Sequence, residues 1–191
     1  MWTSTTFYGY SCPVMMSLKA FAPVLASKLG TTPAAIYERQ RALIRAHLLP
    51  APIGRGRGNG LPARAETVAL MIIALMVTDN LSDTDDRVQK AADAAFAPLP
   101  GKKTRCTFTG AQDFKSALIV ILESKEVARD VSSIQLLRED LSAQIVFGRG
   151  SRRSVSSFGN KSYRTMMQIE AKIPGKILMD IGKALQGTAT A

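Results

Sequence analysis

Cysteine, histidine and long apolar runs are scarce in this sequence, and each shortage excludes a class of protein. Two cysteines, Cys12 and Cys106, cannot build a disulfide scaffold, and the single histidine, His47, leaves no imidazole cluster for a metal site. The longest apolar run, residues 68–77, is too short to span a bilayer. The N-terminus has no basic start followed by an apolar stretch, the pattern of a secretory signal. We therefore expect a cytoplasmic protein with no metal, cofactor or membrane partner.

The sequence motifs of common enzyme classes are also missing. The chain contains no GxxxxGK(S/T), HExxH, CxxC or GxSxG, and its glycine-rich segment GRGRGNG lacks the spacing of a dinucleotide loop. Acidic residues cluster only in the segment 79–86, which reads as a solvated helix junction rather than a pair of catalytic carboxylates. These absences predict that the protein is not an enzyme.

Positive charge is the strongest compositional signal. The chain carries 25 Lys and Arg against 15 Asp and Glu, a net charge of +10. The excess is segmental, with +7 in residues 1–64, −4 in residues 65–100 and +7 in residues 101–191. Such a field attracts phosphate polyanions and acidic surfaces. Net charge alone does not distinguish DNA, RNA, anionic lipid and an acidic protein as the partner.

The N-terminal half reads as an arm followed by a helical domain. Residues 1–16 are aromatic and rich in Ser and Thr without a helical period, and residues 17–96 form the predicted domain. Periodicity and end signals predict helices over 18–29, 33–49, 65–80 and 84–96. The helix over 65–80 is apolar around most of its circumference, so we expect it to be buried, with a dimer interface as the alternative.

The C-terminal half predicts an antiparallel α+β module over residues 104–187. A linker over 97–103 separates it from the helical domain, and Thr109 with Gln112 forms a plausible capping box for its first helix. Alternating patterns predict strands over 132–138, 143–148, 154–158 and 163–173, followed by a helix over 175–186. The predicted fold class is therefore α+β.

Residues 17–49 have the spacing of a helix-turn-helix. A small residue, Ala26, suits a close helix crossing, Gly30 suits the left-handed turn, and Ile36 would fill the crossing. Thr32 and Pro33 form a strong start for the second helix. An ordinary helical hairpin is the plain alternative. The DNA-contacting residues predicted from this motif are Thr32, Ala34, Ala35, Tyr37, Arg39, Arg41 and Arg45.

Two further basic segments are candidates for phosphate contact. Arg55 and Arg57 lie in GRGRGNG and, with Arg64, suit a wing or arm that reaches a minor groove or the DNA backbone; a solvated linker is the alternative. The second segment surrounds a predicted hairpin, and charges that prevent edge-to-edge aggregation are the alternative. Its basic residues are Arg149, Arg152, Arg153, Lys161 and Arg164.

The segment RALIRAHLL, residues 41–49, resembles the end of the recognition helix in winged helix-turn-helix regulators. It departs from that pattern by His47, where the family usually has glycine, and by Arg39, at a usually apolar position. Over residues 18–95, the order of helix-turn-helix, GRGRGNG and the apolar helix RAETVALMIIAL resembles regulators of alphaproteobacterial prophages and gene transfer agents. This resemblance implies a transcription factor acting on phage-like promoters.

Together these observations predict a nucleoid-associated, sequence-specific DNA-binding transcription regulator, by preference an activator, of phage-like or gene-transfer-agent genes. It would consist of a winged helix-turn-helix domain and an α+β module that dimerises, binds an effector or contacts RNA polymerase. The expected partners are promoter duplex DNA, RNA polymerase or another transcription factor, and a second copy of the chain. Two alternatives stay open: an antiterminator-like factor that binds RNA polymerase, and an RNA-binding phage component.

Overall fold

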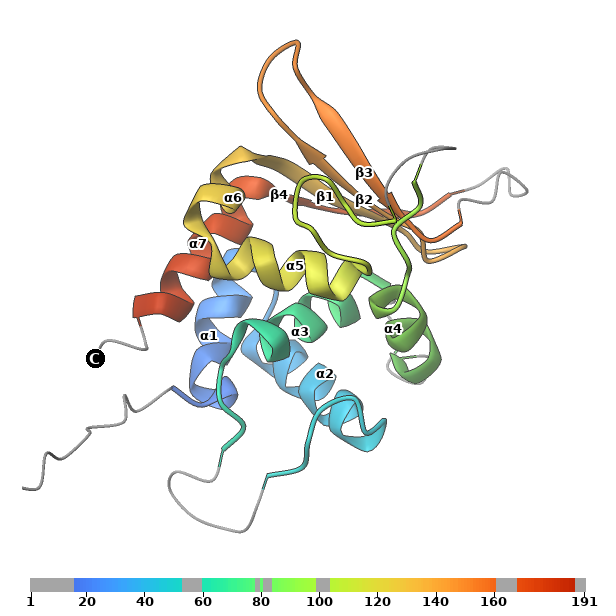
Figure 1. Ribbon diagram of the computed structural model, residues 1–191. Coiled ribbons are helices and arrows are strands. Elements are labelled where there is room, and N and C mark those ends of the chain that lie inside the picture. The colour runs from blue at the N-terminus through green and yellow to red at the C-terminus, as the bar shows by residue number, and fades with distance from the viewer. Residues whose placement is uncertain are drawn as a thin grey trace, which may run out of the picture.

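The protein has an α+β fold, with helices packed against one face of a four-stranded antiparallel sheet (Figure 1). The computed structural model describes residues 16–52, 60–77, 80, 84–98, 104–160 and 168–187. The helices in these residues are α1 Leu18–Leu29, α2 Pro33–Arg45, α3 Ala65–Val77, α4 Thr84–Ala92, α5 Phe114–Glu123, α6 Lys125–Asp130 and α7 Gly175–Gly187. The strands are β1 Val131–Leu137, β2 Ala143–Phe147, β3 Ser154–Phe158 and β4 Glu170–Pro174.

The sheet has the order β3-β2-β1-β4, and its two faces differ in character. On the inner face, Ile134 of β1 lies opposite Ile145 of β2 and Ile173 of β4, and all three are buried. One row of the other face is polar in all four strands. This row consists of Lys172, Gln135, Gln144 and Ser157. The alternation of apolar and polar residues therefore sets which face of the sheet the helices cover.

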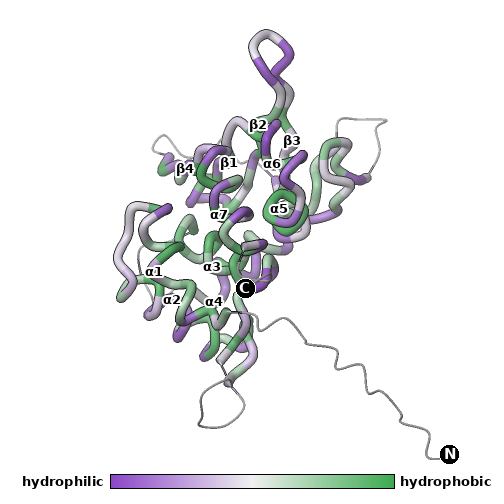
Figure 2. The backbone as a smooth tube through the Cα atoms, turned by 90° about the vertical axis from the view of Figure 1, so that its left-hand side faces the viewer, coloured by the Kyte–Doolittle hydropathy of each residue, from purple (hydrophilic) through white to green (hydrophobic). Residues whose placement is uncertain are grey.

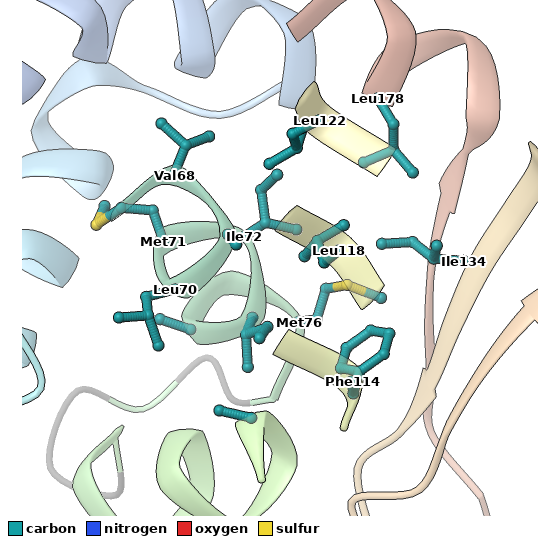
Figure 3. Close-up of a cluster of buried hydrophobic side chains, with 14 of the residues drawn as sticks. Val68, Leu70, Met71, Ile72, Met76, Phe114, Leu118, Leu122, Ile134 and Leu178 are labelled. Atoms are coloured by element: carbon teal, nitrogen blue, oxygen red, sulfur yellow. The ribbon is translucent and has the colours of Figure 1, made fainter. Parts of the chain in front are cut away.

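Helix α3 lies at the centre of a core shared by the whole described chain. Eleven of its thirteen residues are buried, as its apolar circumference predicts. In Figure 3, Ile72 and Met76 of α3 lie beside Leu118 and Phe114 of α5, with Ile134 of β1 close by. A helix without a polar face must be covered on every side, and α1, α2 and α4 cover only part of it. The predicted linker over 97–103 therefore does not separate two hydrophobic cores, because α5 and the sheet complete the packing around α3.

The structure confirms several predicted helix ends. Gly30 ends α1 in the left-handed conformation at φ 67°, as predicted. The side chain of Ser17, which was not predicted as a cap, caps the start of α1 by accepting a hydrogen bond from the Ala20 amide. The Thr32 side chain caps α2 in the same way, with Pro33 at the first helical position. Short-range signals were sufficient here because each cap is made by residues within a few positions.

Four predicted boundaries need correction. Helix α5 is capped by Asp113, whose carboxylate accepts from the Ser116 amide at 2.8 Å, so Thr109 and Gln112 do not form its capping box. Helix α6 was not predicted. The last predicted strand, 163–173, is seen over Glu170–Pro174: residues 168–169 do not belong to it, and residues 161–167 lie outside the described part of the chain. The remaining corrections shorten two helices: α2 ends at Arg45, and α4 ends at Ala92.

The residues after α4 join the sheet instead of extending the helix. The Ala97 amide donates to the Ser157 carbonyl oxygen at 2.9 Å, and the Gly159 amide donates to the Ala95 carbonyl oxygen at 2.7 Å. These bonds cover the C-terminal end of the outer edge of β3, which would otherwise present unpaired backbone groups. Besides the shared core around α3, these hydrogen bonds directly connect the two predicted domains.

Candidate nucleic-acid interface

The turn between α1 and α2 has the geometry that its spacing predicts. The Thr31 amide donates to the Ala26 carbonyl oxygen at 3.0 Å, and the Ala35 amide donates to the Thr32 hydroxyl oxygen at 3.1 Å. Ala26 and Ile36 are both buried in the core between the two helices. The chain therefore forms two closely packed helices joined by a tight turn, in which a small residue permits the close contact.

One face of α2 is exposed and basic. Ala34, Tyr37, Arg41 and Arg45 recur every three or four residues and are all exposed, so they form a single stripe along the helix. Lys19 of α1 extends this stripe, because its Nζ lies 6.0 Å from the centre of the Tyr37 ring. We call Lys19, Tyr37, Arg41 and Arg45 the α2 surface. Lys19 is not among the residues predicted from the sequence, since its place beside Tyr37 depends on how the two helices cross.

The acidic residue on this face does little to neutralise it. Glu38 Oε1 lies 3.2 Å from Arg41 NH1, and both side chains are about half exposed. An exposed pair of this kind contributes only about 0–1 kcal/mol. Arg41 can exchange this partner for a phosphate or a base at little cost. Ala35, also predicted to contact DNA, is only partly exposed, whereas Thr32 is exposed at the start of the helix.

Arg39 does not belong to the α2 surface, which corrects the prediction that it contacts DNA. Its exposed fraction is 6%, and its guanidinium NH1 donates to the Asn80 carbonyl oxygen at 3.3 Å. Arg39 stands where the helix-turn-helix pattern usually has an apolar residue. Its burial and its hydrogen bond show that it is an internal residue of the fold. Arg39 points toward the chain that follows α3, away from any DNA that could lie along α2.

Two more arginines bind the C-terminal end of α3. Arg87 Nε donates to the Val77 carbonyl oxygen at 3.2 Å, and Arg138 Nε donates to the Met76 carbonyl oxygen at 2.9 Å. Arg87 also donates to the Arg138 carbonyl oxygen. The last carbonyl groups of a helix lack partners within the helix and carry partial negative charge, and α3 has no basic residue in its own last turn. Distant arginines supply the missing donors and positive charge.

The end of α2 explains the histidine in the recognition-helix pattern. His47 has a left-handed backbone, at φ 57°, directly after the helix. The Leu48 amide donates back to the Leu43 carbonyl oxygen at 2.9 Å, which closes the last turn. Glycine takes this conformation at the lowest cost, so His47 occupies a position that favours glycine.

The structure does not add the other predicted N-terminal arginines to the α2 surface. Arg55 and Arg57 lie outside the described residues. Arg64 is exposed but lies at the start of α3, where it lines a shallow pocket of about 310 Å³ together with Glu123 and Gln186. This places Arg64 against the C-terminal ends of α5 and α7.

The second basic segment forms the turn of a projecting β-hairpin. Strands β2 and β3 are joined by a turn over residues 148–153, which projects from the body of the protein (Figure 1). Arg149, Arg152 and Arg153 are all exposed in this turn, and we call them the hairpin tip. Figure 2 shows the same turn as a hydrophilic protrusion. Lys161 and Arg164, predicted to join this surface, lie outside the described residues.

The start of the projecting turn is anchored to the body by the end of α6, the start of β1 and the loop before α5. The Gly148 amide donates to the Asp130 carbonyl oxygen at 2.8 Å, and the Ser132 hydroxyl donates to the Gly148 carbonyl oxygen at 3.1 Å. The ring of Phe147 stacks on Phe108, with centroids 4.2 Å apart and an angle of 11° between the planes. These contacts hold the direction in which the hairpin projects.

The buried cysteine belongs to the hydrophobic core near the hairpin base. Cys106 Sγ lies 3.1 Å from Ser156 Oγ, and the Thr109 amide donates to the sulfur at 3.4 Å. Burial raises the pKa of the thiol, and hydrogen bonds with Ser156 and Thr109 outweigh this effect, so the pKa lies below its ordinary value. The thiol is 1% exposed, which closes it to substrates.

The described ranges contain neither a metal-ligand cluster nor a helix of membrane-spanning character. No three His, Cys, Asp or Glu side chains in these ranges lie close enough together to hold a metal ion. None of the helices in the same ranges combines the length and apolar character that crossing a bilayer requires.

The two basic surfaces lie at opposite ends of the molecule. The hairpin tip is at one end of the views in Figures 1 and 2, and α2 lies toward the other, with the sheet, α3 and α5 between them. A comparison with models of known protein families, with curated proteins and with solved structures finds no significant match to this chain.

Proposed function

We propose that the protein binds double-stranded DNA through the α2 surface and regulates transcription without catalysing a reaction. The observation that carries this proposal is the exposed stripe of Tyr37, Arg41 and Arg45 on the second of two closely packed helices joined by a tight turn. A helix of this kind fits the width of the major groove of B-DNA. Phage-like promoters are the expected targets, following the resemblance described above.

The residues of α2 suit distinct roles along a groove. Ala34 is small and exposed near the start of the helix, so it permits close approach to base edges. Tyr37 and Arg41 follow one and two turns later and would contact bases and backbone, while Arg45 would reach phosphates beyond them. The Thr32 oxygen accepts from the Ala35 amide, and its hydroxyl proton can be donated to a phosphate at the helix N-terminus.

Selection from a random duplex library followed by fluorescence anisotropy tests this proposal. We expect the wild-type protein to enrich a defined sequence. The variant Arg41→Gln with Arg45→Gln should bind the enriched duplex about tenfold or more weakly, because a lost base contact costs roughly 1–3 kcal/mol.

The matched control removes the same charge elsewhere. Lys125 on α6 and Lys183 on α7 are exposed and lie outside both basic surfaces. The variant Lys125→Gln with Lys183→Gln should bind the enriched duplex within about twofold of the wild type. Equal losses in the two variants, or no enrichment of any sequence, would overturn recognition by α2. Capture of RNA polymerase in the absence of DNA, with no enrichment, would favour a polymerase-binding factor instead.

A further inference from the structure

We propose that the hairpin tip is a second, independent binding surface for duplex DNA, so that one chain holds two duplex segments at its two ends. The second segment would be bound through phosphate groups by Arg149, Arg152 and Arg153. The inference rests on the proposed function for the first segment, which the α2 surface binds.

The turn that carries the arginines has a defined geometry. The Arg152 amide donates to the Arg149 carbonyl oxygen at 3.1 Å, and Gly148 and Gly150 adopt left-handed backbones at φ 89° and φ 56°. At Gly148 a Cβ atom would lie 2.3 Å from the Arg152 carbonyl oxygen, so only glycine permits this approach of the two chains. A preorganised turn of this kind loses little conformational entropy when its side chains bind.

The turn of the hairpin is the part that can approach duplex DNA. Strands β2 and β3 pair over five residues each, from Ala143 opposite Phe158 to Phe147 opposite Ser154, and every residue of β2 also pairs with β1, so the two strands belong to the sheet. Only the turn over residues 148–153 continues beyond this ladder (Figure 1). The structure therefore presents a narrow basic loop whose arginines can reach the phosphates beside a groove.

The charge of the hairpin favours a polyanion. Residues 141–169 contain no Asp or Glu, so the arginines are not neutralised from within their own segment. Arg149 NH2 approaches Asp130 Oδ1 only to 4.0 Å, and the Arg149 side chain is 74% exposed. Such a long, exposed pair contributes little and leaves the guanidinium able to bind phosphate bidentately.

An exposed apolar side chain adjoins the charged turn. Val155 is 55% exposed and lies opposite Val146 in the ladder. Together with Tyr37 of the α2 surface, it is among the few large apolar side chains exposed in the described residues. An apolar group beside arginines at the edge of the sheet suits contact with the sugars of a DNA backbone.

The positions of the two surfaces imply two duplex segments. Because α2 and the hairpin tip lie on opposite sides of the core, a straight groove that receives one of them cannot also receive the other (Figures 1 and 2). One molecule would therefore bridge separate duplexes or close a loop between two sites on one duplex.

A capture assay with two duplexes tests the bridge. One duplex, carrying the selected sequence, is fixed on beads, and a fluorescent random-sequence duplex is added with the protein. The wild type should retain the fluorescent duplex on the beads. The variant Arg149→Gln, Arg152→Gln and Arg153→Gln should still bind the fixed duplex but retain little of the second one, and the triple variant Lys90→Gln, Lys125→Gln and Lys183→Gln should behave as the wild type.

The salt dependence of random-sequence binding gives a second readout that does not depend on α2. If the three arginines each contact one phosphate, the slope of log K against log salt should fall by about 2.7 in the hairpin variant. Undiminished capture together with an unchanged slope would overturn the inference and leave the arginines as solubilising charges. Stronger competition by single-stranded RNA than by duplex DNA would overturn the choice of partner. Loss of sequence selection with the slope effect intact would instead count against α2 alone.

Discussion

Arg138 Nε donates a hydrogen bond of 2.9 Å to the carbonyl oxygen of Met76, 62 residues earlier in the chain. This bond joins the turn after β1 to the C-terminal end of the central helix α3. It therefore connects the two segments that the sequence analysis assigned to separate domains. The contact explains why the end of α3 is stable without a basic residue in its own last turn.

Removing the Arg138 side chain should destabilise the whole fold. The variant Arg138→Gln loses a charged donor at partly buried carbonyl groups, which costs about 1.5–3 kcal/mol. Urea unfolding followed by circular dichroism should show one cooperative transition at a lower midpoint. The exposed Arg129→Gln variant is the control and should stay within about 0.5 kcal/mol of the wild type. Two separate transitions in the wild type would contradict a shared core.

Substitutions of Arg39 and Arg41 should have opposite consequences. Arg39 is buried and hydrogen-bonded, so Arg39→Met should lower the free energy of unfolding by about 1.5–3 kcal/mol. Arg41 is exposed, so Arg41→Met should change the free energy of unfolding by less than about 0.5 kcal/mol and weaken DNA binding instead. Urea unfolding and anisotropy on the selected duplex measure the two effects. A large change in stability for Arg41→Met would contradict its assignment to the surface.

Replacing His47 with glycine should stabilise the protein. His47 holds a left-handed backbone that glycine adopts without steric cost, and we expect a gain of about 0.5–1 kcal/mol after the greater freedom of glycine in the unfolded chain is counted. The neighbouring Ala46 is right-handed, so Ala46→Gly should cost about 0.5–1 kcal/mol. Thermal unfolding of the two variants gives the comparison. A lower melting temperature for His47→Gly would mean that the imidazole itself supports the helix end.

Two glycines in the hairpin turn should differ in their tolerance of a side chain. In Gly148→Ala the new Cβ would collide with the Arg152 carbonyl oxygen, whereas at Gly150 it would meet nothing within 4 Å. We expect Gly148→Ala to loosen the hairpin and to cost more than Gly150→Ala, whose backbone strain alone is about 1 kcal/mol. Hydrogen exchange of the β2 and β3 amides measures the loosening. Equal protection in the two variants would argue against a rigid turn.

Local patterns in the sequence predicted most of the secondary structure. The caps at Gly30 and Thr32 and the ladder strands β1, β2 and β3 depend on residues close together in the chain, so their signals can be read directly. The cap of α5 was assigned wrongly because Thr109 and Asp113 both have side chains that cap helices, and only the path of the preceding turn decides between them. The stripe of Tyr37, Arg41 and Arg45 was likewise predictable from helical spacing.

The amino-acid sequence by itself determined where helices and strands form and where positive charge accumulates, because these properties depend on neighbouring residues and on composition. Only the tertiary structure decided what each charge does. It buried Arg39 at the end of α3, placed Lys19 beside Tyr37, and set the hairpin tip at the far side of the core from α2. The physical reason is that a guanidinium binds whichever carbonyl, carboxylate or solvent lies within reach, and long-range packing around the apolar helix α3 sets those neighbours.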